Sequence, residues 1–144
     1  MPQLVNQESR GFTHFFRITG TELATTGYLT SSEKLIASLP AGGIITNAAV
    51  VVNTALAGAS DITISVGTVT GTATNLIAST DLDNLTKVAY NTGSAVDTEP
   101  GLVNNTTAAT PVFARFGGTV GSLTGGDFTI ALTILDPGAI STGV

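Results

Sequence analysis

Alternation between apolar and hydroxylated side chains is the feature that most constrains this chain. In segment 61–66, Asp-Ile-Thr-Ile-Ser-Val, three β-branched apolar residues fall on one side and three polar residues on the other. Segment 128–134 repeats the pattern between Gly125-Gly126 and Asp136-Pro137-Gly138, with an apolar side made of Phe128, Ile130, Leu132 and Ile134. A period of two is the period of a strand with one buried face. Both segments are therefore predicted to be half-buried β-strands.

Weaker segments follow the same rule, at 13–19, 34–39, 44–54, 87–90 and 112–116, with short strands at 68–70 and around Leu102. Turn-forming glycine, proline and asparagine separate them. No window keeps the three-and-four spacing of an amphipathic helix, and one helical turn within 75–85 is the most that the pattern allows. We predict an all-β fold, an antiparallel two-sheet sandwich that is jelly-roll-like and has about eight strands.

A length of 144 residues is typical of one domain with its own core. The pattern predicts a sandwich domain over residues 12–137, preceded by an N-terminal arm over 1–11 and followed by a C-terminal tail over 138–144. The chain has no cysteine, which excludes a disulfide scaffold, a thiolate metal site and a cysteine nucleophile.

Charged residues are few, 10% of the chain against about 25% in an average soluble domain, and the mean hydropathy is +0.39. Charge normally keeps protein surfaces apart, so we expect part of the exterior to be covered by another copy, in a homo-oligomer. The net charge is −5, and the five cations are scattered: Arg10, Arg17, Lys34, Lys87 and Arg115. A basic face that follows phosphates is absent, so no nucleic-acid partner is expected.

Residues 35–60 carry no charge and are long enough to cross a membrane. Pro40, Asn47 and Asn53 argue against a membrane helix, and the β-branched run at 50–52 favours a strand, so no membrane partner is expected. The first eight residues lack the basic and then apolar order of a signal peptide, which predicts a chain made and used without Sec-type export.

The sequence predicts no enzyme, no catalytic residue and no cofactor. His14 is the only histidine, and neither a metal partner nor a nucleophile elbow accompanies it. Alternating carboxylates can collect calcium, which makes Asp81, Asp83 and Asn84 candidate metal ligands. The cluster lacks the glycine and the bidentate glutamate of an EF-hand loop, and we expect it to satisfy turn amides instead.

Segments 39–55 and 61–67 resemble small structural proteins of tailed bacteriophage heads. In those proteins a Leu-Pro-Gly turn leads into a long strand ending in Thr-Ala, and a second strand ends in Val-Gly. Segment 75–82 and the final stretch 116–130 are similar to a later step and to the last hairpin of the same proteins. The likeness spans about residues 35–135.

The resemblance implies a capsid cement or decoration protein with a jelly-roll fold, often trimeric. Such a protein is made in the host cytoplasm, binds the major capsid protein on the outer surface of the virion between capsomers, and has no catalytic residues. We expect residues 1–16 to contact the capsid, with Phe12 and Phe15 as apolar anchors and Arg10 and Arg17 beside them. Two alternatives remain open: a virion fibre or receptor-binding head domain that recognises a host surface glycan, and a lectin-like module that uses calcium.

Overall fold

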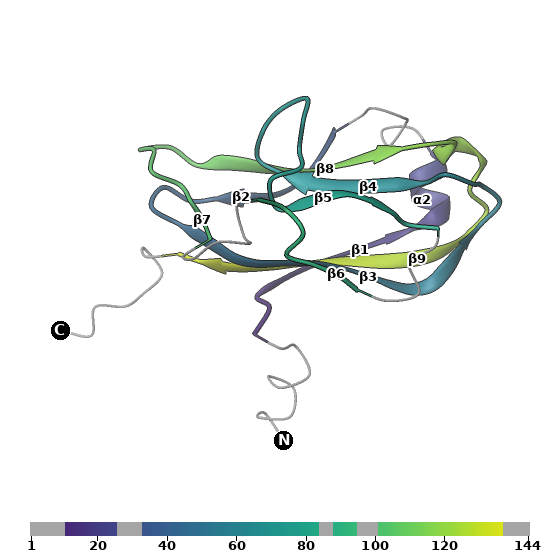
Figure 1. Ribbon diagram of the computed structural model, residues 1–144, viewed down its shortest axis with the longest axis horizontal. Coiled ribbons are helices and arrows are strands. Elements are labelled where there is room, and N and C mark those ends of the chain that lie inside the picture. The colour runs from purple at the N-terminus through teal and green to yellow at the C-terminus, as the bar shows by residue number, and fades with distance from the viewer. Residues whose placement is uncertain (1–10, 26–32, 84–87, 95–100, 137–144) are drawn as a thin grey trace, which may run out of the picture.

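The computed structural model describes residues 11–25, 33–83, 88–94 and 101–136, and it confirms the predicted all-β sandwich. Sheet A contains, in spatial order, β1 (His14–Thr19), β9 (Gly125–Leu135), β3 (Ile44–Ala57) and β6 (Val88–Tyr90), and β7 (Leu102–Val103) also pairs with β3. Sheet B contains β2 (Glu33–Leu39), β8 (Thr110–Gly117), β4 (Thr63–Gly67) and β5 (Ile77–Asp81). Figure 1 shows the two sheets as two stacked layers.

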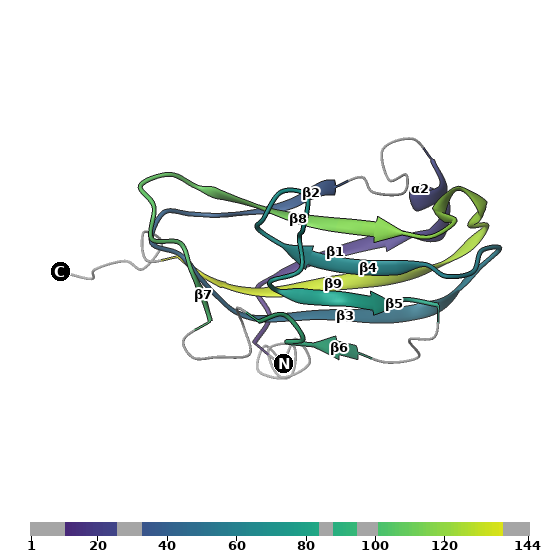
Figure 2. The same ribbon diagram turned by 45° about the horizontal axis from the view of Figure 1, so that its top comes forward.

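The order of the strands is that of a jelly roll. In sheet A the last strand, β9, lies between β1 and β3, and in sheet B the strand before it, β8, lies between β2 and β4. All of these neighbours are antiparallel. The chain passes repeatedly from one sheet to the other. This connectivity forms the double Greek key that defines the jelly roll. Figure 2 shows β8 between β2 and β4, and β9 between β1 and β3.

The core lies between the sheets and is built from the apolar halves of the alternating segments. Ile62, Ile64 and Val66 are buried on one side, as are all four residues predicted for the inner face of β9. The rings of Phe116 on β8 and Phe128 on β9 meet across the two layers, with centroids 5.9 Å apart. The inward side of each predicted strand is therefore confirmed where the alternation is strongest.

One short strand was predicted in the wrong place. Residues 68–70 form a bend and turn, and the remaining strand of sheet B is β5, inside the segment where a helical turn was allowed. The side chain of Asn75 accepts a hydrogen bond from Thr68 N at 2.8 Å and donates to Thr68 Oγ1 at 2.9 Å, and these bonds close a turn over residues 68–75. Ile77, which pairs with Val66, supplies the buried position of the true strand.

Two short helical segments were missed: α2 (Gly20–Ala24) and the 3₁₀ turn η1 (Val120–Ser122). A capping box begins α2, because Glu22 N donates to Thr19 Oγ1 at 3.2 Å and Thr19 N donates to Glu22 Oε2 at 2.8 Å. The Thr-x-x-Glu spacing that signals this box is present in the sequence. Figure 1 shows α2 at one end of the sandwich, where its Leu23 is buried.

The segment considered for a membrane span, 35–60, contains most of β2 and all of β3. Within the described ranges, no helix has the length and the apolar character needed to cross a bilayer. Residues 1–10 and 138–144 lie outside the described residues, so the predicted N-terminal arm and C-terminal tail stay predictions.

Candidate interaction surface

Sheet A presents an aromatic pair, Phe12 and Phe15, on its outer side. Phe16 and Ile18 face the core, so by alternation Phe15 and Arg17 of the same strand face outward. The side chain of Phe15 is 53% exposed, which is unusual for a ring of this size. The rings of Phe12 and Phe15 meet edge to face, with centroids 6.3 Å apart and an angle of 68° between their planes. This geometry is favourable for two aromatic rings.

Hydrogen bonds to β9 position the residues that carry this pair. Thr13 N donates to Leu132 O at 3.0 Å, and Ile134 N donates to Thr13 Oγ1 at 2.9 Å. Gly11 O accepts from the hydroxyl of Thr133 at 3.2 Å. The backbone on either side of Phe12 is thus fixed to the sheet, and the aromatic pair is formed before any partner arrives.

Across the sheet, Phe15 pairs with Ala131, which pairs in turn with Ala49. Both alanines are buried although they lie outside the core cluster between the sheets. They are only 3% and 1% exposed, so neighbouring groups already cover them, and the side chains of Thr129 and Thr133 flank Ala131 on the same side of β9.

A polar network lies beside the aromatic pair on the same face of sheet A. Arg17 forms an ion pair with Asp127, and its side chain is 70% exposed while that of Asp127 is only 6% exposed. Asn53 Nδ2 lies 3.5 Å from the same carboxylate and donates to Thr129 Oγ1 at 2.9 Å. Hydrogen bonding from Thr54, together with the bond and charge of Arg17, lowers the pKa of Asp127 from its ordinary value of 3.8, although burial acts in the opposite direction.

The lowered pKa of Asp127 predicts a loss of stability in acid. As the pH falls, the carboxyl of the unfolded chain takes up a proton before that of the folded chain does. The ionised carboxylate therefore contributes its full stabilisation of the folded state above pH 3.8, and this stabilisation is lost as the pH falls further. In unfolding titrations followed by circular dichroism, the stability gap between wild type and Asp127→Asn should narrow below that pH. Thr54→Val removes one hydrogen bond to this carboxylate, so it should reduce the acid-dependent loss of stability. A gap that stays constant in acid would contradict the assignment.

The remaining candidate residues lie elsewhere. His14 is exposed, and its Nδ1 is 2.7 Å from Thr13 Oγ1. Arg10 and Asn84 fall outside the described residues. Asp83 Oδ2 accepts from Ile62 N at 2.8 Å, and Asp81 Oδ1 accepts from Asp83 N at 3.0 Å, so both carboxylates hold turn amides. In the described ranges Asp83 Oδ1 is buried without a hydrogen-bond partner, and no group of three or more His, Asp or Glu could hold a metal ion.

The comparison with solved structures finds chains from phage capsids. A chain titled "Cyanophage Pam1 capsid asymmetric unit" is similar with a TM-score of 0.55 and 19% sequence identity, over 82% of this chain and 79% of that one. A chain from the "Acidic stable capsid structure of Helicobacter pylori bacteriophage KHP30" has a TM-score of 0.47 and 13% identity, over 87% and 95%. No protein-family model and no curated protein sequence matches. The resemblance to phage head proteins is confirmed at the level of the fold, which this chain shares with the Pam1 chain.

Proposed function

We propose that this chain is a structural protein of a bacteriophage virion: a cement protein that binds the outer capsid surface between subunits of the major capsid protein and stabilises the shell. The observation that carries the proposal is the jelly roll shared with the Pam1 capsid chain over about four fifths of each chain. The head-protein-like segments support it, because they form most of β3, all of β4 and β5, the end of β8 and the start of β9.

Cement proteins work by multivalency. A rigid oligomer that touches several neighbouring subunits turns weak single contacts into strong collective attachment. A trimer of this chain would suit such sites. Its exterior is rich in threonine and serine and poor in lysine, arginine and glutamate, the residues whose immobilisation costs most entropy.

The proposed capsid contact is the aromatic pair, with Arg17 at its border. Phe15 offers an exposed ring on a strand that is paired along its length with β9. Buried aromatic residues at the centre of an interface usually carry much of its binding energy. Arg17 is already paired with Asp127, so we assign it to the rim of the contact, where charge adds specificity more than affinity.

The variant Phe15→Ser tests the proposal. We expect it to weaken binding to shells of the parent phage that lack this protein by about tenfold or more, because a hot-spot aromatic contributes at least about 1.4 kcal/mol. Cosedimentation of purified chain with such shells measures the effect. The multivalent assembly should amplify it.

Leu35→Ser is the matched control. Leu35 is 57% exposed but lies on β2 of the other sheet, so its loss removes a similar apolar surface from a face outside the proposed contact. Both variants should stay trimeric in sedimentation equilibrium. Equal binding by Phe15→Ser and wild type would exclude the aromatic pair as the contact. No detectable binding of the wild-type chain to shells would exclude the cement role.

A further inference from the structure

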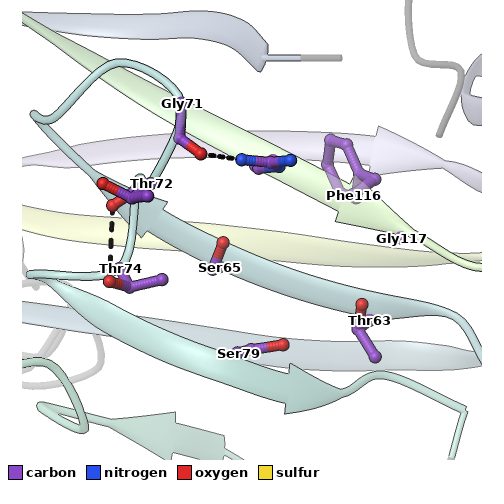
Figure 3. A pocket seen from close by; sticks show the side chains of 9 residues that line it. Thr63, Ser65, Gly71, Thr72, Thr74, Ser79, Phe116 and Gly117 are labelled. Atoms are coloured by element: carbon purple, nitrogen blue, oxygen red, sulfur yellow. Dashed lines mark hydrogen bonds between the residues drawn. The ribbon is translucent and has the colours of Figure 1, made fainter. Parts of the chain in front are cut away.

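A hollow lies on the outer face of sheet B, on the side of the molecule opposite to the aromatic pair. It has a volume of about 370 Å³ and lies between β4, β5, β8 and the β4–β5 connection. Hydroxyl side chains line it: Thr63 and Ser65 on β4, Ser79 on β5, and Thr72 and Thr74 in the connection, with Arg115 of β8 as the charged member. Figure 3 shows Thr63, Ser65 and Ser79 on the strands, and Thr72 and Thr74 in the connection to one side of them.

Ser65 is the residue that most favours a binding site in this hollow. It is 6% exposed, and its hydroxyl points into the hollow (Figure 3). In the part of the chain that the structure describes, no group bonds to this hydroxyl, nor to those of Thr63 and Ser79. The residue is almost buried, but its hydroxyl opens onto the hollow, where water or a ligand can bond to it.

The hollow is also preformed. Arg115 Nη1 donates a hydrogen bond to Gly71 O, and Gly71 N donates to Glu33 Oε1 at 2.6 Å, so two side chains of the sheet hold one residue of the connection. The bonds between Asn75 and Thr68 close the base of the same connection. A ligand would therefore meet a fixed wall and would not have to order a loop on binding.

The charges around the hollow select the ligand class. Arg115 is the charged residue of the lining, but Glu33 lies opposite it on β2, and Asp81 lies opposite Thr63 on β5, so two carboxylates flank the hollow. An anion would gain nothing from this arrangement. Hydroxyl groups both donate and accept, and the N–H groups of Arg115 beyond the one on Gly71 can donate to a neutral oxygen.

We propose that this hollow binds a neutral sugar, one hexose unit of a glycan. The volume lies at the lower end of the range for ligand pockets, which suits a single ring. Phe116 lines the hollow but is 1% exposed, so it offers no face on which a sugar could stack, and we expect a dissociation constant of about 1 mM for one site. Many copies on one particle would make such a weak site effective on a host surface.

An NMR titration of the full-length chain tests this site. The probes are the methyl glycosides of glucose, galactose, mannose and N-acetylglucosamine, with glucuronate as the charged comparison. At least one neutral glycoside should produce saturable shifts in the amides of β4 and of residues 68–74, and glucuronate should bind more weakly than the glucoside. Ser65→Ala and Ser79→Ala should each weaken binding about fivefold, the effect of losing one neutral hydrogen bond.

Ser38→Ala, an exposed serine on β2 outside the hollow, is the matched control and should bind like wild type. The proposal is overturned if no neutral glycoside gives saturable shifts, if both hollow variants bind like wild type, or if glucuronate binds more tightly than the glucoside. Shell cosedimentation of Ser65→Ala should be unchanged. The sugar site and the capsid contact can therefore fail separately.

Discussion

Replacing Phe128 with alanine should lower the free energy of unfolding by about 3–5 kcal/mol. Phe128 is fully buried on β9, and its ring packs against Phe116 of the facing sheet at an interplanar angle of 59°. Truncation removes an aromatic contact between the two layers and leaves a cavity in the core. Denaturant unfolding followed by circular dichroism measures the loss.

The total stability of a domain this size is about 5–15 kcal/mol, so Phe128→Ala can leave too little folded protein to measure. Phe128→Leu keeps most of the volume and should cost less than alanine while remaining measurable. Phe15→Ala is the matched control, because it removes the same ring from an exposed position of the same sheet. A Phe128 variant no less stable than Phe15→Ala would mean that the core does not lie between these sheets.

The second large effect should come from Asn104→Ala, at about 2–4 kcal/mol. Asn104 is 4% exposed, and its Nδ2 lies 2.9–3.0 Å from three carbonyl oxygens, those of Leu39, Pro40 and Ala108. Its Oδ1 accepts from the backbone N and the hydroxyl of Thr106, at 3.1 and 2.7 Å. One side chain thus ties the β2–β3 turn to the connection before β8, and alanine would leave these groups without partners.

The variant Asn104→Asp separates the contribution of hydrogen bonding to stability from the contribution of side-chain shape. Aspartate fills the same space but cannot donate when ionised, so its carboxylate would face three carbonyl oxygens, and it should destabilise at least as much as alanine at neutral pH. Asn105→Ala changes the exposed neighbouring asparagine and should cost less than about 0.5 kcal/mol. Thermal unfolding of the three variants compares them directly. Equal melting temperatures for Asn104→Ala and Asn105→Ala would contradict the role of Asn104.

The aromatic residues show how far the candidate contact could be predicted. The alternation shows which side chains share a face of the strand. It does not show which face the other sheet will cover. Phe116 and Phe128 are buried, whereas Phe15 lies on the open side of sheet A. Phe15 was predicted as an anchor, and its exposure, which agrees with that role, could be read only from the packed layers.

The networks on the outer faces could not be predicted, because their members are far apart in the chain. Arg17 and Asp127 are 110 positions apart and meet only because β1 lies beside β9. Thr63 and Ser65 looked like solvated positions in an alternating strand. Neither their spacing nor their chemistry indicated a hollow. It forms because Arg115 holds the β4–β5 connection at the edge of that face.

Local pattern was enough for the fold class, for the long strands and for their buried sides, since the two-residue period of a strand is a property of consecutive side chains. Packing of the whole chain decided the rest: that β5 and not residues 68–70 completes sheet B, that β8 and β9 insert between earlier strands, and which outer faces carry an aromatic pair or a hollow. These outcomes depend on contacts between distant segments, whose free energies are set by the assembled core and not by any one stretch of sequence.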